Sequence, residues 1–167
     1  MSMEPTPRIV RVWSRVHGSD RSGYSIIELM RTRPDDPRRG VLITVRRKGE
    51  RGLTIKLSEE EARRLAVSID QQVRSGRRPR DEAVDVYSTS PHARTEDGQQ
   101  VYVKLTVRQT PQGSFAVRIS KGDDYRSIGL TPDEALVLAK YVEEIISYYF
   151  QHDVREGRRP RRSQPAQ

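Results

Sequence analysis

Basic and aromatic side chains alternate with apolar ones along several short segments of this chain. In residues 9–13, Val10 and Val12 fall on one side of an extended chain, and Arg11 and Trp13 fall on the other. Tyr87 matches Trp13 in a second copy of this pattern. The same alternation with buried positions is expected for six further cations: Arg46, Lys56, Lys104, Arg108, Arg118 and Arg126. Aromatic rings stack on unpaired bases while cations neutralise phosphates, so the combination is typical of a surface that holds a single nucleic-acid strand.

Three other tyrosines, Tyr24, Tyr102 and Tyr125, offer further stacking surfaces on the expected strands. Arginine outnumbers lysine 26 to 5. This bias fits the same chemistry, because a guanidinium both forks onto phosphate and stacks on planar rings.

The sequence Gly-Arg-Arg-Pro-Arg occurs twice, at residues 76–80 and 157–161. The net charge is +8, and seven of these charges fall in residues 75–80 and 154–167. Proline and like charges disfavour a helix there, so we expect arms that bind phosphate without sequence preference. The arginines of these arms are Arg77, Arg78, Arg80, Arg158, Arg159, Arg161 and Arg162.

Each of these features also has a structural interpretation. Trp13 and Tyr87 would equally serve as core between two halves of the molecule. Strand arginines are often solvated, or form ion pairs with carboxylates such as Asp85 and those of the acidic helices. The two arginine-rich segments would also serve as a solubilising linker and tail.

The elements that position these residues follow from an internal repeat. The segment Leu57–Ala66 returns 73 positions later as Leu130–Ala139, and similar residues surround both copies. A repeat of this length indicates two supersecondary units derived from one duplication and related by a pseudo-twofold axis.

Each unit is predicted to contain four strands and a helix. Ser58 with Glu61, and Thr131 with Glu134, are capping boxes that mark the two helix starts. Apolar residues at helical spacing follow both caps. The strands are expected at residues 9–13, 24–31, 41–47 and 53–57 in the first unit, and at 84–88, 100–108, 115–120 and 125–130 in the second.

The predicted fold class is therefore α+β, with tandem duplicated ββββα units that form two antiparallel four-stranded sheets and two helices. We expect a flexible N-terminus at 1–7, a first unit at 8–75, a basic linker at 76–82, a second unit at 83–153 and a basic flexible tail at 154–167. One unit alone would bury a marginal core, so the two units are expected to share one compact domain.

Composition argues against several classes of protein. Without cysteine, disulfides and thiolate metal sites are excluded, and the three histidines have no second ligand at metal spacing. No glycine-rich phosphate loop opens a helix. We therefore expect no catalysis, cofactor or metal. No apolar run of about 18 residues is present, so we expect no membrane span and a cytoplasmic protein. Absent asparagine and abundant charge favour a thermophilic source, whereas nine glutamines argue against one.

A duplicated four-strand-plus-helix unit with this Leu-Ser/Thr-x-x-Glu-Ala helix entry resembles the Whirly and positive-cofactor-four superfamily of single-stranded nucleic-acid binders, and also Pur-alpha repeats. The resemblance covers roughly residues 8–150. It implies a pseudo-twofold pair of sheets that binds single-stranded DNA, or RNA, in genome maintenance, transcription or nucleoid organisation.

Two other functions stay open at this stage. The first is a protein that coats double-stranded DNA or chromatin, mainly through its arginine arms. The second is an oligomeric interaction scaffold, in which the longer second helix assembles copies through Tyr148, Tyr149 and Phe150.

Overall fold

The structure is a computed structural model that describes residues 9–13, 25–47 and 49–157. It confirms an α+β protein with two antiparallel sheets and two helices. None of the helices in this part of the chain is long and apolar enough to cross a membrane.

The first sheet pairs its strands in chain order. Its strands are β1 (Ile9–Trp13), β2 (Ser25–Arg31), β3 (Val41–Arg47) and β4 (Leu53–Leu57). Helix α1 (Glu59–Ser75) follows. Along β3, Val41, Ile43 and Val45 are fully buried while the residues between them are partly exposed, so one face of this sheet packs on the core.

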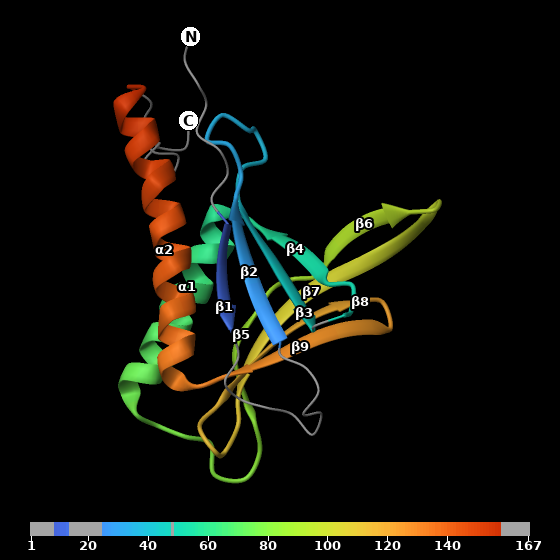
Figure 1. The fold of residues 1–167 in the computed structure, drawn as a ribbon, viewed down its shortest axis with the longest axis vertical. Coiled ribbons are helices and arrows are strands. Elements are labelled where there is room, and N and C mark those ends of the chain that lie inside the picture. Colours follow the sequence, from blue (N-terminus) through green and yellow to red (C-terminus); the bar gives the residue numbers. More distant parts are fainter. Residues whose placement is uncertain (1–8, 14–24, 48, 158–167) are drawn as a thin grey trace.

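The second sheet has five strands, followed by helix α2 (Pro132–Arg155). Its strands are β5 (Val84–Ser88), β6 (His92–Glu96), β7 (Gln99–Gln109), β8 (Phe115–Lys121) and β9 (Asp124–Leu130). Strands β5, β7, β8 and β9 are neighbours in that order, and β6 pairs with the first part of β7. The β6–β7 hairpin projects from the body of the molecule (Figure 1).

The prediction of four strands in the second sheet was therefore wrong. Strand β6 was missed because its sequence, His-Ala-Arg-Thr-Glu, has no apolar face, and all five residues are at least partly exposed. A turn signal was nevertheless present in the sequence. Asp97 and Gly98 both have positive φ, at 50° and 76°, as the two central residues of a tight hairpin turn require.

Both helix starts have the predicted capping boxes. Ser58 accepts a hydrogen bond from the Glu61 backbone N–H, and the Glu61 carboxylate accepts one from the Ser58 N–H. Thr131 and Glu134 make the same pair of bonds. These bonds satisfy amide groups that have no partner within the helix.

The glycine of each Gly-Arg-Arg-Pro-Arg segment lies at a helix end. Gly76 adopts φ 67° as the cap of α1, and Gly157 adopts φ 69° just beyond α2. A left-handed residue at this position is most often glycine, because it has no Cβ to clash. The repeated motif thus has a structural component, a helix stop, in addition to its arginines.

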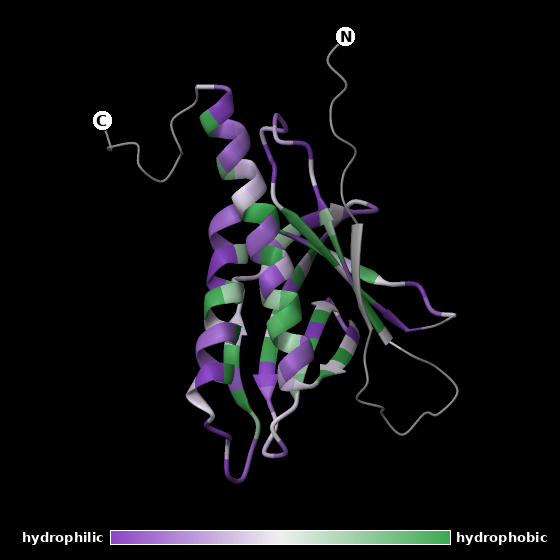
Figure 2. Cartoon of the chain, turned by 60° about the vertical axis from the view of Figure 1, so that its left-hand side comes forward, coloured by the Kyte–Doolittle hydropathy of each residue, from purple (hydrophilic) through white to green (hydrophobic). Residues whose placement is uncertain are grey.

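The N-terminal and C-terminal halves share one hydrophobic core. Residues of both sheets and both helices belong to a single buried cluster. Helix α1 contacts α2 and strand β5 of the other half, while α2 contacts β1 and β2. The two helices lie side by side along the sheets (Figure 1), and each carries separate hydrophobic and hydrophilic residues along its length (Figure 2).

Specific polar contacts also link the two halves. Arg39, in the β2–β3 loop, pairs with Asp153 near the end of α2 at 2.5 Å and also with Glu59 at the start of α1. The Tyr149 hydroxyl donates to a backbone carbonyl and lies 2.9 Å from both the Thr32 and the Gly40 oxygens. These contacts hold the β2–β3 loop against α2.

The burial of Tyr149 corrects the expectation that Tyr148, Tyr149 and Phe150 form an assembly surface. Tyr149 is completely buried within its own chain. The Tyr148 ring packs under the Arg31 guanidinium at 3.7 Å, and only Phe150 of the three is exposed. Tyr149 of the longer α2 therefore belongs to the core.

Candidate nucleic-acid interface

The face of the second sheet that points away from the core carries cations and tyrosines, and we call it the open face. Along β7, Val103, Leu105 and Val107 are buried, so the residues between them lie on the open face. Lys104 pairs across the sheet with Ser120, which pairs with Tyr125. In the next row Thr106 pairs with Arg118, and Arg118 pairs with Ser127. The strand register therefore brings Lys104, Arg118 and Tyr125 together.

Two tyrosines of the open face present their rings to solvent. Tyr102 and Tyr125 each have 53% exposure, which is high for so large an apolar surface. The Arg118 guanidinium lies 4.1 Å from the centre of the Tyr125 ring. The small residues Ala116 and Ser120 lie on either side of Arg118 along this face of β8.

The open face is positively charged. Lys104 and Arg118 have no carboxylate partner among the residues that the structure describes. Arg108 pairs with Asp85 at 2.7 Å, which is the ion pair that the sequence offers as the alternative role of a strand arginine. Both side chains of that pair are more than half exposed, so solvent weakens the pair and Arg108 keeps the capacity to contact phosphate.

The Tyr87 ring does not lie on the open face, contrary to the interpretation of Tyr87 as a stacking residue. A β-bulge shifts the register between Asp85 and Tyr87, so that Asp85 pairs with Arg108 but Tyr87 pairs with the buried Val107. The ring packs against the core, and its hydroxyl donates to the Glu61 carbonyl at 2.9 Å. The alternative role of Tyr87, as core between the two halves, is the one the structure contains.

Burial raises the pKa of Tyr87 to about 12, and the nearby Glu61 charge adds to this effect. An unfolded phenol ionises near pH 10, so above that pH the unfolded state loses its proton first and unfolding becomes more favourable. Between about pH 9 and about pH 11.5, the free energy of unfolding of the wild type should therefore fall by about 1–2 kcal/mol more than that of Tyr87→Phe, which has no phenol to ionise. The difference is smaller than the full pKa shift would give, because the ring is only half-buried and solvent screens the charge. Urea unfolding at the two pH values measures this difference. Equal losses in both proteins would show that the Tyr87 phenol is not protected.

The glutamate beside Tyr87 also joins the two halves. Burial raises the pKa of Glu61, but hydrogen bonds from His92 and from the Ser58 backbone outweigh it, so the net pKa is lowered. The His92 ring nitrogen lies 2.8 Å from the Glu61 carboxylate. These groups form a structural contact between α1 and β6.

Arg126 was also assigned to the wrong face. It pairs with the buried Ile119 and follows the alternation of Ile128 and Leu130, so it lies on the core side of β9. Its guanidinium donates to the Arg51 carbonyl at 2.8 Å and to Asp124 at 2.6 Å. Tyr125, one position earlier, is the residue of this strand that reaches the open face.

Of the predicted residues of the first sheet, the structure describes the side chains of Arg46 and Lys56. Arg46 bonds Glu28 at 2.6 Å, so its charge is largely compensated, and Lys56 pairs in register with Leu42. In β1, Arg11 pairs with Glu28 and Trp13 with Ile26, but the side chains of Arg11 and Trp13, like Tyr24, lie outside the described residues.

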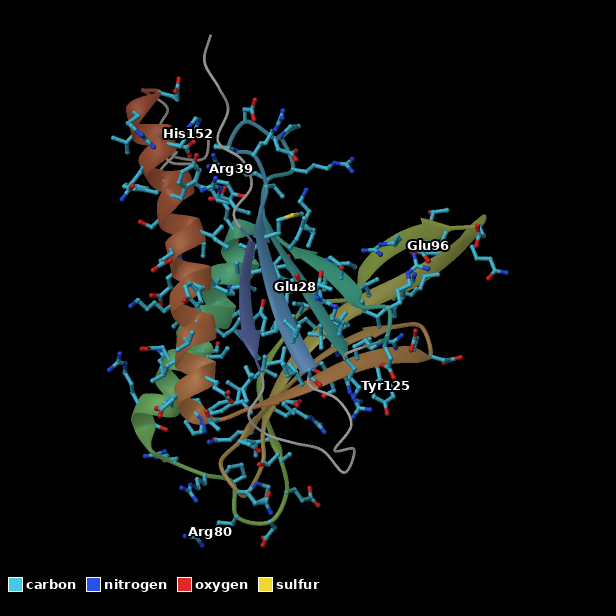
Figure 3. All side chains as sticks on the ribbon, in the orientation of Figure 1. Glu28, Arg39, Arg80, Glu96, Tyr125 and His152 are labelled. Carbon is cyan, nitrogen blue, oxygen red and sulfur yellow. The ribbon has the colours of Figure 1, made fainter. Side chains whose placement is uncertain are left out.

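The first arginine-rich segment adjoins one end of the open face. Arg77, Arg78 and Arg80 are all exposed in the α1–β5 loop, and the Arg78 side chain lies against Gly113 in the β7–β8 turn. Figure 3 shows Arg80 at the opposite end of the sheet from Tyr125. From Tyr102 to Arg108, β7 covers about 20 Å, so the loop extends a basic path along this strand. The second segment, with Arg158, Arg159, Arg161 and Arg162, lies outside the described residues.

The described part of the chain contains no cluster of three or more histidine or acidic side chains placed to hold a metal ion.

No protein-family model matches the sequence, and no curated protein matches it either. The open face therefore has to be interpreted from its own chemistry.

Proposed function

We propose that this protein is a non-enzymatic binder of single-stranded DNA or RNA, and that the strand lies along the open face of the second sheet. The observation that carries the proposal is that the exposed Tyr102 and Tyr125 lie beside Lys104, which has no carboxylate partner among the residues that the structure describes. Unpaired bases stack on such rings, and the cations neutralise the phosphates between them. Arg118, Arg108 and the Arg77–Arg80 loop extend the positive path.

The fold relationship behind this proposal is a tandem duplication of a ββββα unit in a Whirly-like, pseudo-twofold arrangement. The matching caps, the matching helix-stop glycines and the shared core of the two halves support it. In the second unit, β6 lies between the first strand of the unit, β5, and the next strand of the repeat, β7. A role in genome maintenance, transcription or nucleoid organisation belongs to the same proposal.

A fluorescence titration tests the proposal. Labelled single strands of DNA and RNA, about twelve nucleotides long, are titrated with the full chain alongside a duplex of the same sequence, at several salt concentrations. We expect tighter binding of the single strand and a marked loss of affinity with salt. Comparable affinity for the duplex would favour a protein that coats double-stranded DNA, and a salt-independent signal would exclude phosphate binding.

A further inference from the structure

A small cavity of about 270 Å³ opens beside Tyr125, where the turn between β3 and β4 meets strand β9. Arg47, Glu50, Tyr125, Arg126 and Ser127 line it. Its volume is just below the range of pockets for drug-sized ligands, so it suits one small planar group.

The walls of this cavity are held in place from both sides. Arg126 is fixed by its bonds to the Arg51 carbonyl and to Asp124. On the other side, the Glu50 backbone N–H donates to the Arg47 carbonyl at 3.0 Å, and Gly49 with φ 80° allows this tight turn. Glu50 and Arg47 are therefore displayed from a hydrogen-bonded turn.

The Tyr125 ring borders the cavity on a side that Arg118 does not cover. Arg118 lies over the Tyr125 ring at 4.1 Å but does not line the cavity. A planar group that enters the cavity would therefore meet the part of the ring that Arg118 leaves open. Arg47 is exposed at the rim, where a phosphate attached to that group would lie.

We propose that this cavity holds one unpaired base of the bound strand and selects bases that carry an amino group against thymine and uracil. The inference rests on the proposed single-strand binding. The base stacks on Tyr125, its phosphate contacts Arg47, and its unpaired edge faces the Glu50 carboxylate.

The selection follows from hydrogen-bond chemistry at Glu50. A carboxylate only accepts hydrogen bonds, and it accepts well from an amino group such as the one of cytosine. Thymine and uracil present carbonyl oxygens on both sides of a single N–H, and these oxygens repel a carboxylate. The Arg126 Nε lies 3.8 Å from one carboxylate oxygen of Glu50, so this contact does not occupy both oxygens.

The test compares labelled oligo-dC and oligo-dT strands, each about twelve nucleotides long, on the full chain and on Glu50→Gln. We expect the wild type to prefer oligo-dC by about tenfold. The variant should bring the ratio close to one, mainly by binding oligo-dT more tightly, because a glutamine amide both donates and accepts. Loss of the negative charge should strengthen the binding of both strands alike, so it does not change the ratio of the two affinities.

Glu60→Gln is the matched control, because it removes the same charge from a side chain of α1 that is 71% exposed and lies away from the cavity. It should leave the ratio unchanged. A preference that Glu50→Gln does not alter, with both strands still bound, would overturn the cavity proposal alone. If neither strand binds, the proposed function fails and this proposal fails with it.

Discussion

Replacing Tyr102 and Tyr125 together by alanine should weaken single-strand binding by about thirtyfold or more. Each base stacked on an aromatic ring contributes about 1–3 kcal/mol, so losing two stacking positions costs at least about 2 kcal/mol. Both rings are 53% exposed, and therefore their removal should leave the fold and its melting temperature nearly unchanged. Fluorescence titration of a labelled strand measures the loss.

Phe150→Ala is the control for this prediction, since it removes an aromatic ring that is 45% exposed and lies on α2 rather than on the open face. It should leave the affinity unchanged. A double tyrosine variant that binds as tightly as the wild type would show that the strand does not stack on the open face.

The largest effect on stability is expected at the buried ion pair of Arg39 and Asp153. Both side chains are only 6% exposed, and two hydrogen bonds join them, at 2.8 and 2.5 Å. These contacts raise the pKa of Arg39 further above its usual value, so the guanidinium stays charged at any relevant pH. Asp153→Asn would leave that charge buried with Glu59 as its remaining carboxylate partner. We expect a loss of about 3 kcal/mol in the free energy of unfolding.

Urea unfolding of Asp153→Asn measures this loss, with Asp70→Asn as the matched control. Asp70 pairs with Arg74 one helical turn away, and the Arg74 side chain is 72% exposed. Such surface pairs contribute about 0.3–0.5 kcal/mol. Similar losses in both variants would mean that the Arg39 contact does not hold the β2–β3 loop against α2.

Local sequence signals predicted the parts of the fold that depend on local interactions. The capping boxes of Ser58 and Thr131 define the helix starts within one residue, because their hydrogen bonds need only four consecutive positions. Alternation along β3 and β7 likewise predicted which faces are buried. The α+β class followed from these elements.

Other features depended on signals that were misread or on contacts that a sequence does not display. In β9, simple alternation with Ile128 and Leu130 places Arg126 on the core side, so the local pattern itself favours the position that the structure shows. Tyr149 continues the apolar stripe of α2 from Val142 and Ile146. The bulge that turns Tyr87 toward the core leaves no trace in a five-residue strand, since Val-Asp-Val-Tyr-Ser fits regular alternation equally well.

The candidate site was only partly predictable for the same reason. Lys104, Arg108 and Arg118 were correctly placed on the open side of their strands, because their neighbours are strongly apolar. Their meeting with Tyr125 depends on the register across three strands. Positive charge in the sequence alone did not separate them from Arg46 and Arg126, which bond to groups of their own chain.

The salt dependence of binding by Lys104→Ala/Arg118→Ala tests most directly whether the open face holds a single strand. For single strands, the slope of log affinity against log salt is about −0.7 for each phosphate that is neutralised, so the loss of two contacts should make the slope shallower by about 1.4. Arg64→Ala/Arg74→Ala removes the same charge from two side chains of α1 that are 70% and 72% exposed. We expect a shallower slope in the first double variant and the wild-type slope in the second. The same slope in both double variants would show that Lys104 and Arg118 do not contact the phosphates of the strand.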